Sequence, residues 1–447
     1  MYSFLVDCLY DYANVAVLGL FAGCVWYAWQ TVFGPKTAPW FSLAQQLTTP
    51  RILFGDWLSG RRLSIGSWLF TLAAVVYQFE IFFANSLYRY RIPWLFDYGT
   101  MVLDHILALC LLGKILLCTR YDGRQLAVAF GTLFVIRWVF MNNHEKWMLL
   151  ALLFALAAKD VPLRRALKAV FTVGAASVAV VAVSSLLGVI NTVQELGTGR
   201  YRNSFGYGWY NFFGACLLGL AVMYVCLRGI KRLKWFDFAL LAAVTLLCNF
   251  GPDSRAATMC LCVLMVAALV VRIWPVVLRP LPVRILLAAA PVLAFAASMI
   301  LAFLWNPDNP VLAMLDRLLS TRISLGWEAL QTMPFAIAGQ MPADGMLVDN
   351  AYLHYWLVAG PVASALIWGG FALLVWRLLK QGHATEAICC LVMICHGTME
   401  GHVIWACVNV TIWLLCGVIF WPERQPSFSC AEETKKGKIH SKGAVTL

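Results

Sequence analysis

A small set of arginines stands near the ends of apolar stretches: Arg200, Arg202, Arg255 and Arg322. The guanidinium group stays ionised, and its planar fork makes two charge-assisted hydrogen bonds to a phosphate or a carboxylate. Such residues, held together, are suited to binding a group with several negative charges. Simpler roles are also open, because Arg200 can face water or lipid headgroups and Arg255 can pair with Asp253.

Three further side chains could move a proton near these arginines: Asp349, His354 and Glu400. Asp349 is the candidate general base, although Asp349-Asn350 directly precedes an apolar stretch, where Asp or Asn also caps a helix. His354 is the alternative base, or a hydrogen-bonded residue at the membrane interface. Glu400 is expected to pair with one of the arginines.

His396, Glu400 and His402 raise the question of a metal site. On one helix with about 3.6 residues per turn, His396 and Glu400 share a face, whereas His402 lies about 120° away. No metal is therefore expected. No cofactor is expected either, because the sequence has neither a GxxxxGK[ST] phosphate loop nor a GxGxxG dinucleotide motif.

The elements that must position these residues are apolar helices. Hydrophobic residues form 62% of the 447-residue chain and charged residues 13%, and the mean hydropathy is +0.76, which is typical of a polytopic membrane protein. The expected fold is an all-α bundle of about eleven to thirteen spans, each needing about 20 residues for a straight crossing. The candidate spans are 13–33, 63–83, 99–118, 125–140, 147–158, 167–190, 212–227, 236–250, 256–271, 285–304, 351–376, 387–396 and 402–420.

Orientation follows from the excess of Lys and Arg that short cytoplasmic loops retain. This rule places the Lys-rich C-terminus in the cytoplasm and the loop 305–350 outside, on the side that is poor in positive charge. The arginines named above fall on that same side. The net charge of +12 is explained by this topology, and no nucleic-acid partner is expected, because the basic residues are scattered through short loops.

Two regions are expected, a transmembrane domain over 1–421 and a disordered cytoplasmic tail over 422–447. Within the outer loop 305–350, the apolar spacing over 311–330 predicts one amphipathic helix lying along the membrane surface. Most of the fifteen cysteines stand singly within apolar stretches and predict neither disulfides nor a zinc site.

Several short motifs between about 200 and 420 occur in an order that resembles the O-antigen polymerase and O-antigen ligase superfamily of bacterial surface-polysaccharide enzymes. The ligases carry His-Asn where this chain has Asp349-Asn350, which favours a polymerase. The motifs are Arg202-Asn203-Ser204-Phe205-Gly206 with Asn211, Ser254-Arg255, Arg322 with Trp327, Ala329-Leu330 and Gly339, Asp349-Asn350 with Gly360, and Glu400 with Asn409.

The resemblance implies a glycosyltransferase that joins oligosaccharide repeats carried on a polyprenyl diphosphate such as undecaprenyl diphosphate. The product would be an O-antigen, capsule or exopolysaccharide, made by inversion at the outer face of the bacterial cytoplasmic membrane. A chain-length regulator and a flippase are the implied partners. The implied diphosphate ligands are Arg202, Arg255, Arg322 and Arg200. The implied catalytic residues are Asp349, Glu400 and His354. The implied acceptor or sugar contacts are Asn211, Asn350 and Tyr352.

Two alternatives stay open. A ligase would transfer the finished glycan to another acceptor. A lipid-linked oligosaccharide flippase, a protein of a different class, would also bring arginines to an anionic lipid. A transporter is expected to show internal repeats and key charges near the middle of the membrane, and neither pattern is evident in this sequence.

Overall fold

The computed structural model describes residues 51–121, 123–192, 194–195, 202–343, 348–421 and 425–428, with only the backbone of 51–60 and 194–195. The predicted span 13–33, Arg200 and most of the predicted tail lie outside the described residues. Within them, eight helical stretches are long and apolar enough to cross a membrane. The prediction of a polytopic helical membrane protein is confirmed at this level.

The longer helices are α3 (Arg51–Ala84), α5 (Pro93–Leu117), α6 (Gly123–Asn143), α8 (Leu163–Leu186), α9 (Tyr210–Arg228), α11 (Arg255–Ile273), α12 (Leu281–Phe303) and α16 (Gly360–Lys380). The shorter elements are α4 (Tyr88–Arg91), α7 (Lys146–Ala157), η1 (Ile230–Arg232), α10 (Trp235–Phe250), η2 (Pro275–Leu278), α13 (Pro310–Leu318), α14 (Arg322–Thr332), α15 (Ala351–His354), η3 (Tyr355–Ala359), α17 (Ala384–His396), η4 (Gly401–Ile404), η5 (Val410–Leu415) and α18 (Cys416–Ile419).

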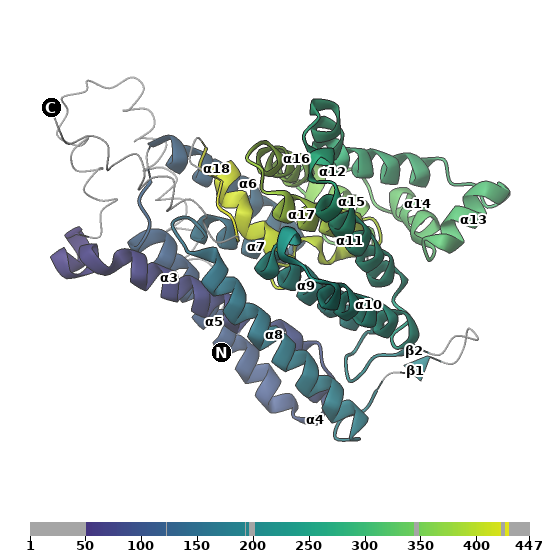
Figure 1. Ribbon diagram of the computed structural model, residues 1–447, viewed down its shortest axis with the longest axis horizontal. Coiled ribbons are helices and arrows are strands. Elements are labelled where there is room, and N and C mark those ends of the chain that lie inside the picture. Colours follow the sequence, from purple (N-terminus) through teal and green to yellow (C-terminus); the bar gives the residue numbers. More distant parts are fainter. Residues whose placement is uncertain are drawn as a thin grey trace.

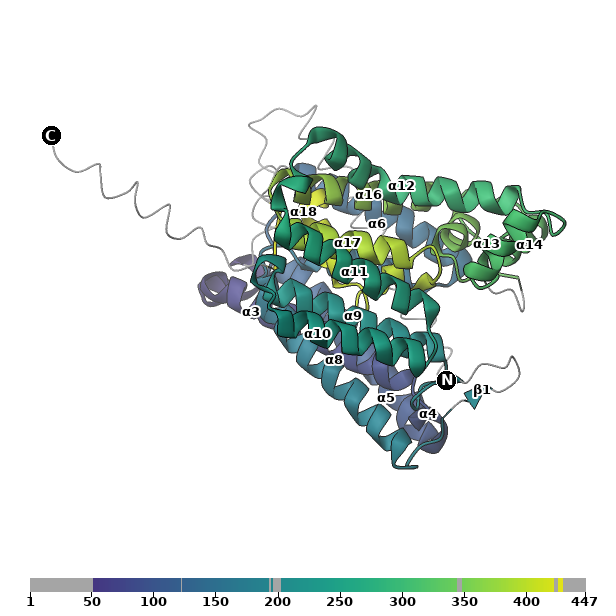
Figure 2. The ribbon, with the colours of Figure 1, turned by 45° about the vertical axis from the view of Figure 1, so that its right-hand side comes forward.

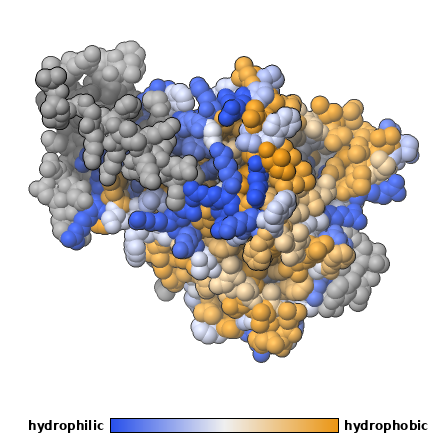
Figure 3. Space-filling view, in the orientation of Figure 1, coloured by the Kyte–Doolittle hydropathy of each residue, from blue (hydrophilic) through white to orange (hydrophobic). Residues whose placement is uncertain are grey.

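The helices form two groups, and helix α17 lies between them. Helix α3 packs against α5 and α8, and α12 packs against α16, while α17 contacts α9, α11, α12 and α16 between them (Figures 1 and 2). Large apolar side chains stay exposed along the outer helices, for example Leu109 on α5 and Leu186 on α8. Figure 3 shows hydrophobic residues over much of one face. An apolar outer surface is what a bundle surrounded by lipid requires.

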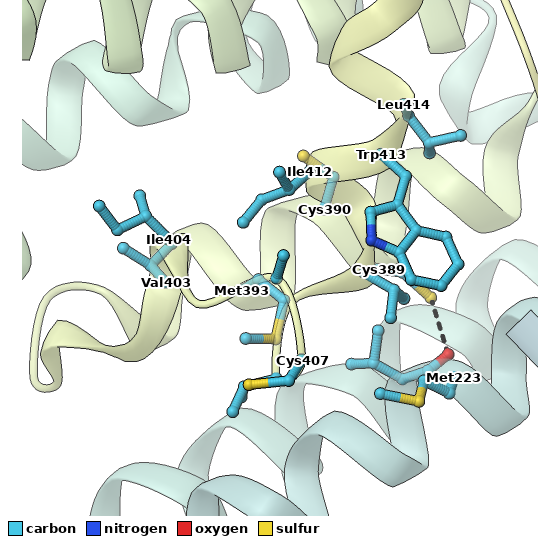
Figure 4. Packing of buried hydrophobic residues seen from close by; sticks show 14 of the residues in the cluster. Met223, Cys389, Cys390, Met393, Val403, Ile404, Cys407, Ile412, Trp413 and Leu414 are labelled. Atoms are coloured by element: carbon cyan, nitrogen blue, oxygen red, sulfur yellow. Dashed lines mark hydrogen bonds between the residues drawn. The ribbon is translucent and has the colours of Figure 1, made fainter. Parts of the chain in front are cut away.

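The predicted span 402–420 is wrong as a single helix, because it divides into η4, η5 and α18. These elements are largely buried and pack against α7 and α17; Figure 4 shows Ile404 of η4 and Trp413 of η5 near Met393 and Cys389 of α17. Asn409 interrupts the helix, since its side-chain oxygen accepts hydrogen bonds from Thr411 N at 3.2 Å and Thr411 Oγ1 at 2.6 Å. Gly219 of α9 admits the Val408 backbone, because a Cβ there would lie 2.8 Å from the Val408 carbonyl oxygen.

The prediction of one amphipathic helix over 311–330 is also wrong. The segment forms two helices, α13 and α14, separated by Ser320 and Thr321, whose φ angles are +55° and +65°. Such left-handed positions end a right-handed helix. Asp316 then starts α14, because its carboxylate accepts hydrogen bonds from Ile323 N at 2.9 Å and Ser324 N at 3.0 Å.

A short strand pair precedes α9. Strand β1 (Gln194–Glu195) pairs antiparallel with β2 (Arg202–Asn203). Asn203 shapes the turn that follows, since its side-chain oxygen accepts hydrogen bonds from Phe205 N at 2.8 Å and Thr192 Oγ1 at 2.5 Å. This turn directs Arg202 toward the start of α9.

Residues 425–428 of the predicted tail pack against the bundle. Gln425 donates to the Leu414 carbonyl at 2.6 Å, and Phe428 N donates to the Glu386 carboxylate at 3.0 Å. Phe428 is fully buried. The packed part of the chain therefore extends past the expected boundary at residue 421.

Candidate functional site

A pocket of about 540 Å³ lies where α9, α11 and α14 begin. Its wall also includes Asp349, two residues before α15 (Ala351–His354), and residues between α17 and η5. The first turn of a helix presents unpaired backbone N–H groups and favours negative charge nearby. The lining residues are Asn85, Arg202, Trp209, Tyr210, Asn211, Phe212, Arg255, Ala256, Ser320, Thr321, Arg322, Leu325, Asp349, Met399, Glu400, His402 and Trp405.

Arg322, the first residue of α14, is held by several protein groups at once. One guanidinium nitrogen, Nη2, lies 2.7 Å from Asp349 Oδ2 and 3.3 Å from Glu400 Oε1. The other two nitrogens donate to backbone carbonyls, Nε to Met399 at 3.0 Å and Nη1 to Ser320 at 3.2 Å. The expected pairing of Glu400 with one of the arginines is therefore present, and Asp349 shares the same partner.

Glu400 is almost fully buried in the connection between α17 and η4. Burial raises the pKa of this carboxyl to about 7, while the positive charge of Arg322 acts in the opposite direction. Asn211 donates a hydrogen bond to Glu400 Oε1 at 3.0 Å. Glu400 can therefore exchange a proton near neutral pH, which is a property of groups that act in acid–base catalysis.

Arg202 reaches the pocket from β2. Its guanidinium carbon lies 3.6 Å from the centre of the Tyr210 ring, and Nη2 donates to the Asp253 carbonyl at 3.2 Å. Stacking on an aromatic ring holds a guanidinium in place without removing its charge. Arg202 is thus positioned by the start of α9 and by the turn before α11.

Arg255, the first residue of α11, is an exposed residue on the pocket wall. Its Nη1 donates to the carbonyl of Arg317 at 3.2 Å. This contact joins α11 to the end of α13, so the loop containing α13 and α14 is tied to the bundle beside the pocket. The side chain of Arg317 itself is not part of the pocket wall.

Asn350, and not Asp349, caps α15. The Asn350 side-chain oxygen accepts hydrogen bonds from Tyr352 N at 2.9 Å and Leu353 N at 3.3 Å. Asn350 therefore takes the capping role, which the sequence had left open for either residue. Asp349, whose side chain is 37% exposed, faces Arg322.

Three of the predicted site residues are not on the pocket wall. The amide of Asn350 donates to Ser298 at 3.0 Å, and the buried Tyr352 donates to the Ile394 carbonyl at 2.9 Å. His354 lies 3.0 Å from both carboxylate oxygens of Glu145, in the turn between α6 and α7. These contacts are between neighbouring helices, so the structure gives these residues packing partners.

Several wall residues were not predicted as site residues: Trp209, Tyr210, His402 and Trp405. An accumulation of aromatic residues just before and in the first turn of α9 is visible in the sequence and could have indicated the first two. Trp405 gave no such signal, and the sequence indicated His402 only as part of the metal question raised with His396 and Glu400; both residues reach the wall through the broken path after α17. Among the described residues, no group of three or more His, Cys, Asp or Glu is arranged to hold a metal ion.

The fold and the pocket define a polytopic helical membrane protein with a recess that holds both arginines and carboxylates. No protein-family model matches the chain, and neither curated proteins nor solved structures give a match.

Proposed function

We propose that this protein is a membrane glycosyltransferase that polymerises oligosaccharide repeats carried on a polyprenyl diphosphate. One observation carries the proposal. Arg202, Arg255, Arg322 and Asp349, which lie in separate motifs of the superfamily that the sequence resembles, all line one pocket. Residues far apart in the chain thus meet at one surface, as a shared substrate requires.

The chemistry of the wall suits this substrate. Arg202, Arg255 and Arg322 would stabilise the charge that develops on the departing diphosphate, and the starts of α9 and α11 add to that effect. Aromatic side chains such as Trp209 and Trp405 can pack against sugar rings. The attacking hydroxyl of the acceptor needs a proton acceptor, for which the wall offers the carboxylates of Asp349 and Glu400.

The proposed reaction is an inverting displacement. An acceptor hydroxyl attacks the anomeric carbon of the donor from one side, and the diphosphate leaves from the other. The donor is already activated by its diphosphate, so the reaction needs no nucleotide. We propose that the pocket faces the outside of the cytoplasmic membrane, with the C-terminus in the cytoplasm.

The test is the lipid-linked glycan profile of cells that lack the protein, complemented with wild type, Arg255→Gln or Arg317→Gln. The two substitutions are matched, because Arg255 lines the pocket and Arg317 contributes only its backbone carbonyl to the contact between them. We expect single repeats to accumulate at the outer face without the protein and with Arg255→Gln, and normal polymer with Arg317→Gln.

Other profiles would contradict the proposal in distinct ways. Full-length lipid-linked chains that never reach their final acceptor would indicate a ligase. Repeats accumulating at the inner face would indicate a flippase. Normal polymer with Arg255→Gln would remove Arg255 from the diphosphate site.

A further inference from the structure

His402 lies on the pocket wall in a setting that the arginines and carboxylates do not explain. Its side chain is 15% exposed, and its Nδ1 is buried without a hydrogen-bond partner. The nearest carboxylate oxygen, Glu400 Oε2, is 3.8 Å from this nitrogen. A buried ring nitrogen without a partner is costly and calls for a functional explanation.

The His402 ring is held in one orientation by aromatic neighbours. Trp405 meets it edge to face with ring centres 4.8 Å apart, and Phe212 lies 5.7 Å away. Trp405 is in turn stacked on Trp147 of α7 at 4.1 Å. The imidazole is therefore held by packing, with Nδ1 on the side of Glu400.

A second imidazole lies behind the first. His396, at the end of α17, is fully buried, and neither of its ring nitrogens has a hydrogen-bond partner. Its ring centre is 6.1 Å from that of His402, and the two rings are nearly parallel, at 18°. The titratable and charged groups that surround this region are Glu400, His396, Arg322, Asp349 and Arg202.

We propose that Glu400 and His402 act as a carboxylate–imidazole pair in which His402 is the catalytic base and Glu400 is its positioning residue. The proposal rests on the proposed function and identifies the group that accepts the proton. In this pair the hydrogen on Nδ1 would face Glu400 Oε2, which is 3.8 Å away, and the lone pair of Nε2 would be left for the substrate.

The reaction transfers one proton to His402 and one glycosyl group to the acceptor. The O–H bond of the acceptor breaks, and its proton goes to Nε2 of His402. The oxygen electron pair forms the new bond to the anomeric carbon. The bond from that carbon to the diphosphate oxygen breaks, and its electron pair leaves with the diphosphate near Arg202 and Arg255.

Asp349 is less suited to this step. Its carboxylate oxygen lies 2.7 Å from the guanidinium of Arg322, so the oxygen is already occupied by a cation. We assign Asp349 the role of holding Arg322 in place.

The first test compares reaction rates of purified full-length protein in phosphatidylethanolamine and phosphatidylglycerol vesicles. The probe is the lipid-linked glycan fraction extracted from cells that lack the protein, and the rate is followed from pH 5 to 9. We expect His402→Gln to lower kcat by about 100-fold or more, with little change in KM, and to remove the acidic limb of the wild-type profile. The control is His105→Gln on α5, where the side chain is exposed and outside the pocket, and it should leave the rate unchanged.

The second test measures the pairing without relying on activity. Diethyl pyrocarbonate modifies neutral imidazole, and mass spectrometry gives the extent of modification of His402. The comparison is made at pH 8, above the pKa of about 7 that burial gives Glu400, so that this carboxyl is ionised. An ionised Glu400 favours hydrogen on Nδ1 and leaves Nε2 free to react, whereas without it the two tautomers are about equally populated, so Glu400→Gln should lower the extent of modification at Nε2 by about twofold.

The outcomes separate the two proposals. A full rate in His402→Gln, with the acidic limb retained, would overturn the catalytic role, and an unchanged extent of modification at pH 8 in Glu400→Gln would overturn the pairing. If wild-type protein fails to extend the glycan, the proposed function is wrong and the catalytic role falls with it, while the extent of modification still decides the pairing.

Discussion

At the scale of single residues, two carboxylates in the pocket form ion pairs with one guanidinium. Asp349 and Glu400 both approach the same nitrogen of Arg322, but Asp349 is 37% exposed and Glu400 is buried. An exposed ion pair contributes little free energy to stability, whereas breaking a buried pair leaves a buried charge without a partner and costs much more. The two acids therefore have different roles despite a shared partner.

These roles can be separated by matched substitutions. We expect Asp349→Asn to lower the polymerisation rate by about tenfold or less, because it loosens a single exposed ion pair. Glu400→Gln should lower the rate by about 100-fold or more, because it removes the group that orients the base. The measurement is the rate with extracted lipid-linked glycan. A larger loss in Asp349→Asn than in Glu400→Gln would return the role of base to Asp349.

Glu400 also makes stability depend on pH. Its pKa rises from 4.5 to about 7 on folding, so the folded protein holds this proton more tightly than the unfolded chain does. The stabilisation is fully present below pH 4.5 and is lost as the pH rises through about 7. It amounts to about 3 to 4 kcal/mol at most, at about 1.4 kcal/mol per pKa unit.

The corresponding measurement is thermal unfolding of the detergent-solubilised protein at pH 5 and pH 8. Wild type should lose more stability between these two values than Glu400→Gln, whose amide cannot ionise. Other titrating groups affect both proteins alike, so the difference isolates Glu400. An equal loss in both would show that Glu400 titrates in its ordinary range.

At the scale of elements, two glycines allow the loop after α14 to cross the start of α16. Gly339 and Gly360 have φ angles of +80° and +81°. A Cβ on Gly339 would lie 2.5 Å from the Val358 carbonyl oxygen, and one on Gly360 would collide with the Ile337 carbonyl. Gln340 N donates to that Val358 carbonyl at 3.0 Å, which closes the crossing.

We expect Gly360→Ala to destabilise the protein by about 2 kcal/mol or more, through backbone strain and the collision together. The matched control is Gly369→Ala on α16, where a Cβ meets nothing within 4 Å and alanine favours the helix. Unfolding midpoints of the detergent-solubilised variants would show the difference. Equal midpoints would mean that the crossing is not as tight as the structure indicates.

At the scale of the whole molecule, the position of the pocket depends on which side of the membrane the loop 305–350 occupies. The proposed function requires that loop and the C-terminus to lie on opposite sides. Epitope tags inserted between Asp308 and Asn309 and at the C-terminus can test this in spheroplasts. We expect antibody to reach the loop tag in intact spheroplasts and the C-terminal tag only after permeabilisation. Tags exposed on the same side would contradict the arrangement.

The sequence alone predicted the apolar helices and the residues near their ends. Apolar stretches must form helices in lipid to satisfy their own backbone hydrogen bonds, so composition and length indicate them directly. The pocket residues Arg202, Arg255, Arg322, Asp349 and Glu400 were recognised from the sequence, because positive charges are few on the side predicted to lie outside and because these residues fall in the motifs of the resemblance.

Tertiary structure alone decided how these residues are paired and where helices break. Asn350 caps α15 and Asp349 forms an ion pair with Arg322, although the sequence left the capping role open for either residue. The broken path after α17 brings His402 beside Glu400, whereas a continuous helix would have separated them. Such choices depend on contacts between distant segments, which hydrophobic periodicity does not encode.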